Sequence, residues 1–265
     1  MPKPKVCILR TAGTNCDIET AFAFNLAGGT AEMVHINQFI NKMIDMSQYQ
    51  ILAIPGGFTY GDDIAAGKIL ANELRHRLTE HLKKFIQDGK LIIGICNGFQ
   101  VLVKSGLLPG NNEQKQEASL ILNDSDKFEA RWVYLRTRGQ ESRAKNCVWV
   151  KEIPEIIYLP VAHGEGKFVV EACDVLERIK RNGQVVFCYS DKSGRKPLYP
   201  DNPNGSLENI AGICDDTGRI LGLMPHPERH IQSWQSASCQ KKRARKQSDG
   251  LFIFQNAINY AKKHL

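Results

Sequence analysis

The stretch Leu91–Gln100, with the sequence LIIGICNGFQ, constrains the fold of this chain more than any other. Its apolar first half predicts a buried strand, and the residues after Gly98 have helical spacing. Cys96 lies at the junction, between Gly94 and Gly98, where the glycines let the backbone bend tightly. A strand, a sharp turn and a helix form a nucleophile elbow, and the helix N-terminus favours a thiolate. A buried, inert cysteine at a strand end is the alternative, and this stretch alone leaves both open.

The rest of the chain alternates between strand and helix patterns. Apolar runs at Lys5–Arg10 and Ile51–Ile54 predict strands, and Asp17–Ala27 has the spacing of a helix closed by two glycines. The other expected elements are, in chain order, a strand at Ala31–Ile36, a helix over Ile69–Asp88, strands at Leu120–Leu122, Phe128–Thr137, Val148–Val150, Ile156–Val161 and Phe168–Val170, a helix at Val175–Arg181, a strand at Gln184–Tyr189, a hairpin of Ile210–Cys214 and Ile220–Met224, and a helix at Gly250–His264. This alternation predicts an α/β fold with a mostly parallel, doubly wound central sheet flanked by helices.

Composition sets further limits. The 265 residues are 42% hydrophobic and 24% charged, as in ordinary globular proteins, and the absence of repeats or low-complexity linkers favours a single domain over residues 1–265. No apolar run approaches the ~20 residues that span a bilayer, and the N-terminus passes directly into a strand, so we expect no membrane segment or signal peptide. The eight cysteines form no CxxC pair and no tight Cys/His cluster, so we expect no disulfide framework and no metal site, and a reducing cytoplasm.

The net charge of +7 is modest for this length. Much of the excess lies in the run Lys241–Lys246, inside a basic loop or insertion at residues 232–248. We interpret this run as a solvated loop, because nothing resembling a nucleic-acid motif accompanies it, and we expect no nucleic-acid partner.

A glycine-rich loop, Gly56–Asp63, follows the strand Ile51–Ile54. Ligands bind at the carboxyl ends of strands in an open α/β sheet, so this loop and the Cys96 turn can face one pocket. The loop lacks the glycine spacing of phosphate-binding loops, and a plain tight turn is the alternative.

A second candidate segment, Pro225–Glu228, places a histidine between two prolines. The prolines exclude a regular helix or a central strand, and Glu228 can face the same side as His226 in an extended segment. A cysteine nucleophile needs a base and a group that orients the base, and these two side chains supply both. Taken singly, each residue has a plain alternative: His226 as a packed loop histidine and Glu228 as a surface carboxylate.

Taken together, the motifs resemble the class I (triad) glutamine amidotransferases, and within them the glutaminase subunits of phosphoribosylformylglycinamidine (FGAM) synthases. The motifs that carry the resemblance are Gly13–Asp17 (GTNCD), Pro55–Asp63 (PGGFTYGDD), Gly94–Gln100 (GICNGFQ), Ala162–Gly166 (AHGEG), Asn202–Ser206 (NPNGS) and Met224–Arg229 (MPHPER). The chain departs from the pattern at Thr11-Ala12, where an aromatic–proline pair is expected, and in its basic insertion.

The resemblance implies a catalytic triad. Cys96 would attack the carboxamide of glutamine, His226 would protonate the departing ammonia and later activate water against the thioester, and Glu228 would orient His226. Backbone N–H groups of Gly57 or Phe58, together with that of Asn97, would form the oxyanion hole.

The resemblance also implies the substrate contacts and the partners. Gln100 and the segment His163, Gly164 and Glu165 would hold glutamine. A separate large synthase subunit would use ATP and Mg²⁺ to convert formylglycinamide ribonucleotide to its amidine with the ammonia, sometimes with a small third subunit. This chain itself would need no cofactor, and the basic insertion is a candidate contact with the synthase.

Three rival interpretations fit the residues less well. Another hydrolase of the same fold, such as the pyridoxal-phosphate-synthase glutaminase or a cysteine-peptidase-like protein, would lack Asn97–Gln100 together with His163–Gly166. A non-catalytic scaffold subunit would have no chemical need for an intact Cys96, His226 and Glu228. Nucleic-acid binding rests on the basic run alone.

Overall fold

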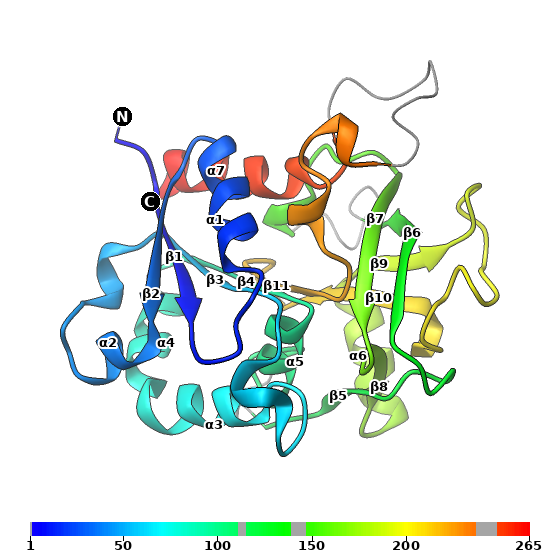
Figure 1. Cartoon of the computed structure of the whole chain (residues 1–265), viewed down its shortest axis with the longest axis horizontal. Coiled ribbons are helices and arrows are strands. Elements are labelled where there is room, and N and C mark those ends of the chain that lie inside the picture. Colours follow the sequence, from blue (N-terminus) through cyan, green and yellow to red (C-terminus); the bar gives the residue numbers. More distant parts are fainter. Residues whose placement is uncertain (1, 111–114, 139–146, 237–247) are drawn as a thin grey trace.

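A nine-stranded sheet runs through the centre of the computed structural model, which describes residues 2–110, 115–138, 147–236 and 248–265 (Figure 1). In sheet order its strands are β2 (Thr30–His35), β1 (Lys5–Arg10), β3 (Ile51–Ile54), β4 (Leu91–Ile95), β11 (Ile220–Leu223), β10 (Ile210–Cys214), β9 (Val185–Ser190), β6 (Glu129–Thr137) and β7 (Ile156–His163). A separate antiparallel pair consists of β5 (Ala118–Ile121) and β8 (Lys167–Val170).

The sheet has two halves of different construction. From β2 to β11 all neighbouring strands are parallel, which confirms the doubly wound pattern. From β11 to β7 every neighbouring pair is antiparallel. We call these the parallel half and the antiparallel half.

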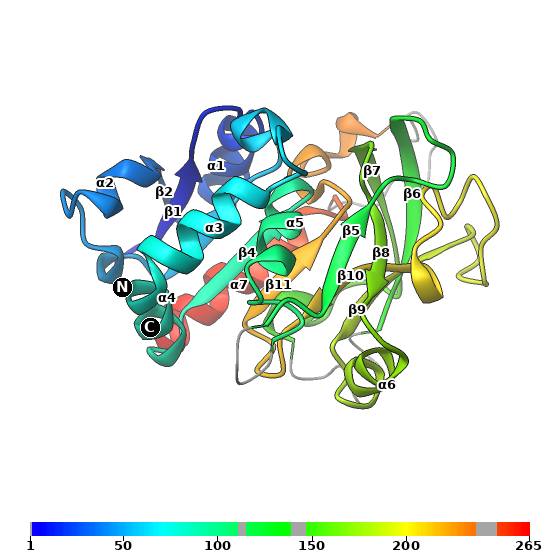
Figure 2. The same ribbon diagram turned by 90° about the horizontal axis from the view of Figure 1, so that it is seen from below.

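Helices cover both faces of the parallel half. The helices α1 (Asp17–Leu26) and α7 (Leu251–His264) lie on one face, and α3 (Lys68–Arg77), α4 (Thr79–Gln87) and α5 (Asn97–Lys104) lie on the other (Figure 2). The short helix α2 (Ile36–Ile40) and the helix α6 (Cys173–Arg181) lie at the periphery. With both faces covered, β3 and β4 are buried along their whole length, which explains their continuous apolar sequence.

Two expected elements differ from the structure. The single helix predicted over Ile69–Asp88 is broken at Leu78, whose φ of −123° is not helical, so that α3 and α4 meet at an angle and both bury leucines. The strand predicted at Val148–Val150 is a 3₁₀ turn, because Trp149 is buried there and its Nε1 donates to Arg219 O rather than the backbone pairing with the sheet.

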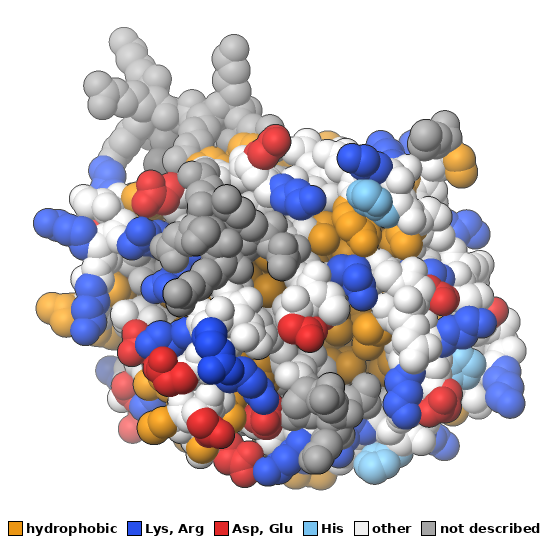
Figure 3. Space-filling model, turned by 180° about the vertical axis from the view of Figure 1, so that it is seen from behind, with side chains coloured by type: hydrophobic (Ala, Val, Ile, Leu, Met, Phe, Trp, Pro, Cys, Tyr) orange, Lys and Arg blue, Asp and Glu red, His pale blue; other side chains and the backbone are white. Residues whose placement is uncertain are grey.

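On the surface opposite the view of Figure 1, lysines and arginines are interspersed with acidic side chains (Figure 3). None of the helices in the described ranges is long and apolar enough to cross a membrane. The basic run Lys241–Lys246 lies outside the described residues.

Candidate active site

Three predicted site segments follow three neighbouring strands. Gly56-Gly57 comes after β3, Cys96 after β4, and His226 after β11. These strands are adjacent and parallel, so their carboxyl ends lie at the same edge of the sheet. The parallel order therefore brings together segments that are far apart in the sequence, as the strand-end argument predicts.

The sharp turn of the elbow lies at Cys96 itself. Its φ of +52° and ψ of −107° place it in the left-handed half of backbone space, between β4 and the first turn of α5. A non-glycine residue in such a conformation costs about 1–3 kcal/mol and is typical of functional sites. The elbow geometry confirms the predicted strand–turn–helix arrangement.

The flanking glycines serve a different purpose from the one predicted. Gly94 and Gly98 do not have positive φ angles, so they do not make the bend. A Cβ atom on Gly98 would lie 1.9 Å from Ile54 O, and one on Gly94 would lie 2.4 Å from Gly98 O. The glycines are needed because α5 starts in direct contact with the backbone of β3 and β4.

His226 and Glu228 form a buried pair. His226 Nδ1 and Glu228 Oε1 are 2.6 Å apart, and both side chains are almost fully shielded from solvent. The contact arises in a 3₁₀ turn, Pro227–Arg229, and not in the extended segment that we expected. The backbone N–H of His226 donates to Pro160 O of β7, which fixes the start of this turn against the antiparallel half.

The charge state of His226 follows from its surroundings. Burial by itself disfavours the imidazolium, but the negative charges of Glu228 and Cys96 outweigh it and raise the pKa of His226 well above its ordinary value. The ring nitrogen Nε2 is buried and has no hydrogen bond within the described residues. It is the nitrogen left to serve Cys96, because Nδ1 is held by Glu228.

Gly56 is the point at which the catalytic groups meet. A Cβ atom on Gly56 would lie 2.8 Å from His226 Cε1, 3.4 Å from Cys96 Cβ and 3.1 Å from Cys16 Sγ. Any side chain at this position would therefore push the imidazole and the nucleophile apart. The glycine-rich loop therefore faces the Cys96 turn, as the strand-end argument predicts, and is more than the plain tight turn that was the alternative.

The structure separates the two alternatives for the oxyanion hole. The Phe58 N–H donates to Gly13 O at 2.9 Å and is therefore occupied. The Gly57 N–H has no hydrogen bond in the part of the chain that the structure describes, and the same holds for the N–H of Asn97 at the start of α5. Of the predicted donors, Gly57 and Asn97 are the two available to an oxyanion.

The Asn97 side chain connects the loops around the cavity. Its Oδ1 accepts from the N–H of Thr59 at 3.2 Å and from the hydroxyl of Thr59 at 2.8 Å. Its Nδ2 donates to Asp62 Oδ1 and to Gln100 Oε1. Gln100 in turn donates to Glu165 O at 2.6 Å, so this network ties the loop after β3 and helix α5 to the segment after β7.

His163 lies at the end of β7, and its tautomer can be assigned. Both N–H bonds of the Asn123 amide point to backbone carbonyls, those of Lys127 and His163. Asn123 Oδ1 is therefore the acceptor facing His163 Nδ1 at 3.1 Å, which requires the proton to be on Nδ1. Burial, with a smaller contribution from the charge of His226, lowers the pKa of His163 to about 3. The ring is thus neutral, with a bare lone pair on Nε2.

These residues surround one cavity of about 380 Å³. Its walls include Gly57, Phe58, Cys96, Gln100, His163, Gly164, Glu165 and His226 from the predicted set. The side chains of Asn97 and Glu228 do not line the cavity but contact residues that do, Gln100 and His226. A hollow of similar volume, 360 Å³, lies beside α4 and contains none of the predicted residues, so chemistry rather than size identifies the site.

The cavity also contains residues to which sequence reasoning gave no role. They are Asn15, Cys16, Asp62, Ala66, Leu122, Phe128, Ala162 and Arg229. Cys16, Asp62 and Arg229 fall inside the quoted motifs, which is the signal that could have singled them out. Leu122, Phe128 and the buried Asn123 carry no such signal, because only the fold brings their segment to the cavity.

Comparisons with known proteins agree with this geometry. The model of the CobB/CobQ-like glutamine amidotransferase domain matches residues 3–261. The chain belongs to this glutamine amidotransferase family. Within it, the chain is 48% identical over 264 residues to phosphoribosylformylglycinamidine synthase subunit PurQ of Dehalococcoides mccartyi, covering 99% of this chain and 100% of that one. It is 42% identical to the subunit of the same name from Archaeoglobus fulgidus, over 98% of this chain and 97% of the other.

A solved structure has the same fold. A chain in the structure of PurLQS from Thermotoga maritima matches with a TM-score of 0.73 and 30% identity, covering 97% of this chain and 99% of that one. The predicted family and the predicted fold are both confirmed.

Proposed function

We propose that this chain hydrolyses glutamine to glutamate and ammonia through a thioester on Cys96. The observation that carries the proposal is the meeting of Cys96, at its strained elbow, with the buried His226–Glu228 pair beside Gly56. The Cys96 thiolate attacks the carboxamide carbon, and the N–H groups of Gly57 and Asn97 stabilise the oxyanion.

Proton transfer falls to His226. The imidazolium gives its Nε2 proton to the departing ammonia, and the neutral ring then takes a proton from the water that attacks the thioester. Glu228 holds Nδ1–H throughout and stabilises the charged ring, as the third member of such a triad does.

His163 supplies the preference for an amide. Its Nε2 can only accept a hydrogen bond, so it can bind an N–H of the glutamine carboxamide but not a carboxylate oxygen. The product glutamate presents two acceptor oxygens there and is disfavoured. Asp62, Glu165 and Arg229 place charges of both signs around the cavity, which suits the zwitterionic end of an α-amino acid.

The ammonia would pass to a partner. Curated relatives are named as subunits of phosphoribosylformylglycinamidine synthase, and the matched structure is of PurLQS. We assign this chain the corresponding place in de novo purine biosynthesis, as the glutaminase subunit beside a larger synthase subunit. ATP and Mg²⁺ would belong to that subunit, which converts formylglycinamide ribonucleotide to the amidine, and the complex would work in the cytoplasm.

A partner would cover an apolar rim. Phe58, Leu122 and Phe128 all line the cavity and are about half exposed or more. Exposed apolar groups gathered at the mouth of a catalytic cavity are typical of an interaction surface, and closing the mouth would keep ammonia from escaping.

Labelling with a glutamine-like diazo-ketone tests the chemistry. Peptide mass mapping should find the label on Cys96, and Cys96→Ser should abolish labelling and lower glutamine-dependent synthesis by about 10⁴-fold or more. The same variant should keep ammonia-dependent synthesis in the complex. Cys173→Ser, at an exposed cysteine, is the matched control and should label normally. Label on any other cysteine would overturn the mechanism.

A further inference from the structure

Cys16 is a second cysteine in the catalytic cavity. It follows the loop after β1 and is buried at the start of α1. Its Sγ donates to Asn15 Oδ1 at 3.2 Å and accepts from Arg229 Nη2 at 3.1 Å. The triad mechanism uses none of these contacts, so the position of this thiol is unexplained by the proposed chemistry.

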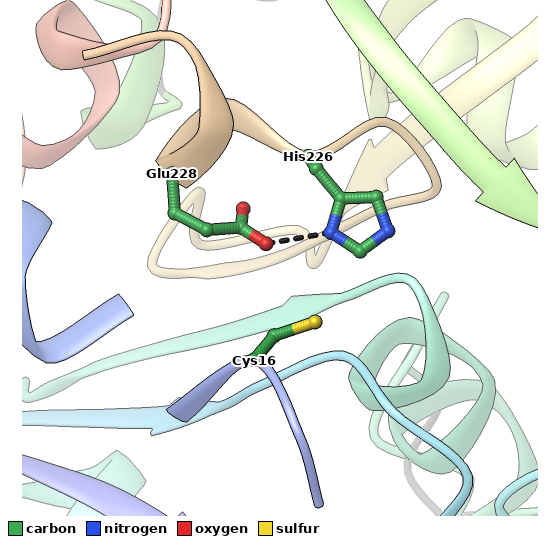
Figure 4. A group of neighbouring side chains, drawn as sticks. All are labelled: Cys16, His226 and Glu228. Atoms are coloured by element: carbon green, nitrogen blue, oxygen red, sulfur yellow. Dashed lines mark hydrogen bonds and ion pairs between the residues drawn. The ribbon is translucent and has the colours of Figure 1, made fainter. Parts of the chain in front are cut away.

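Cys16 points toward the triad base, His226, and the carboxylate that orients it, Glu228. One ligand atom each from Cys16, His226 and Glu228 lie within 4.8 Å of one another, and all three residues are buried. Figure 4 shows the sulfur below the imidazole, turned toward the side where Glu228 meets Nδ1. Spacing along the chain does not reveal this cluster, because Cys16 is more than 200 residues from the other two.

These three donors fit a thiophilic divalent cation. Zinc binds sulfur at about 2.3 Å and nitrogen or oxygen at about 2.0–2.2 Å, which sets the ligand atoms roughly 3.3–3.8 Å apart. His226 Nδ1 and Glu228 Oε1, now 2.6 Å apart, would have to separate by about 1 Å, and a pair at the 4.8 Å limit would have to close by about 1.0–1.5 Å. A set of thiolate, imidazole and carboxylate selects Zn²⁺ over Mg²⁺ or Ca²⁺, which prefer oxygen ligands.

An unused carboxylate oxygen strengthens the case. Glu228 Oε2 is buried and, within the described ranges, has no hydrogen-bond partner. A dry, unpaired oxygen on an ionised group is costly unless something positive reaches it. Rotation of the carboxylate would present either oxygen to a cation held between Cys16 and His226.

We propose that Cys16, His226 and Glu228 form an inhibitory site for Zn²⁺, an inference that rests on the proposed triad. The cation takes the place of the Nδ1 proton and of the Cys16 thiol proton, and both protons leave to the buffer. With Nδ1 bound to the metal, the ring keeps a single proton on Nε2 and has no free nitrogen, so His226 cannot accept the proton of the Cys96 thiol or of the water that attacks the thioester. Cys96 is not a ligand, so zinc lowers kcat and leaves KM for glutamine nearly unchanged.

Zinc titration of the full chain tests the site without turnover. By calorimetry with ZnCl₂, the wild type and Cys96→Ser should each bind one equivalent with the same Kd within a factor of about three. Cys16→Ser should bind zinc at least about 100-fold more weakly, because loss of a group that only hydrogen-bonds to a metal ligand already lowers metal affinity by about 10–100-fold. Cys173→Ser, which removes an exposed cysteine, is the matched control and should bind like the wild type.

Three outcomes would overturn the proposal. They are no binding by the wild type at micromolar zinc, binding that survives Cys16→Ser, and binding that is lost in Cys96→Ser. The last would place the cation between the nucleophile and Nε2, where glutamine would compete with it. Labelling of Cys96 is a separate measurement, so failure of the zinc site leaves the proposed glutaminase chemistry standing.

Discussion

The parallel and antiparallel halves of the sheet contribute to the cavity in different ways. The parallel half supplies the nucleophile, the base and the oxyanion donors, each directly after a strand whose neighbours fix its position. The antiparallel half supplies His163 and Glu165 from the end of β7, at the far edge of the sheet. The first set makes and breaks bonds, and the second recognises the substrate.

The second set depends on long-range packing. Three strands separate β11 from β7 in the sheet, yet the backbone N–H of His226 donates to Pro160 O of β7 at 2.8 Å. The sheet must twist and turn back to allow this contact. Substitutions in the parallel half should therefore slow the chemical step. Substitutions in the antiparallel half should change substrate selection and stability.

The largest effect is expected from Glu228→Gln in the parallel half. Loss of the carboxylate removes the charge that keeps His226 protonated and oriented, so kcat should fall by about 10³–10⁴-fold with little change in KM. Steady-state glutaminase kinetics on the complex measure this. Ammonia-dependent synthesis is the control, and an equal loss there would mean that the variant damages the assembly instead.

A smaller effect is expected from His163→Phe in the antiparallel half. Phenylalanine keeps an aromatic ring at this position but lacks the Nε2 acceptor. The value of kcat/KM for glutamine should therefore fall by about 10- to 100-fold, and inhibition by glutamate should strengthen relative to glutamine binding. His163→Gln can place a carbonyl oxygen near the position of Nε2 and should recover part of the loss. Equal defects in both variants would contradict the acceptor role.

The same residue predicts a dependence of stability on pH. The pKa of His163 falls from an ordinary 6.5 to about 3 on folding, so between these values only the unfolded chain binds the proton. The free energy of unfolding therefore decreases as the pH falls through this range, by up to about 1.4 kcal/mol per pH unit.

Urea unfolding at pH 6.5 and 4.5 measures that cost. Relative to His163→Phe, the wild type should lose about 2 kcal/mol more of its free energy of unfolding over this interval. Other titrating groups are shared by the two proteins and cancel in the difference. A constant difference would mean that His163 is protonated in the folded state.

The smallest effect is expected at the apolar rim. Leu122→Ser should weaken binding to the synthase subunit by about 1 kcal/mol and leave the free energy of unfolding nearly unchanged, because the side chain is 63% exposed. Met43→Ser, at an equally apolar position that is 71% exposed and does not line the cavity, is the matched control. Equal affinities for both variants and the wild type would place the interface elsewhere.

The fold class, the elbow at Cys96 and the pairing of His226 with Glu228 could be predicted from the sequence. The reason is local: a β-branched run, a turn and an amphipathic helix follow from neighbouring residues, and two prolines fix the backbone around a histidine. The order of parallel strands then implies a common edge. Even here the details differed, because Glu228 meets His226 in a 3₁₀ turn and the glycines beside Cys96 serve close packing.

Roles that depend on contacts between distant segments could be assigned only from the folded chain. The choice of Gly57 over Phe58 required knowing that Phe58 N–H donates to Gly13 O. The tautomer of His163 required the two donors of Asn123 to be placed on backbone carbonyls. Cys16 came to His226 and Glu228 only because β1 and β11 deliver their loops to the same edge. Hydrogen-bond partners and donor clusters of this kind are properties of three-dimensional proximity, and spacing along the chain does not contain them.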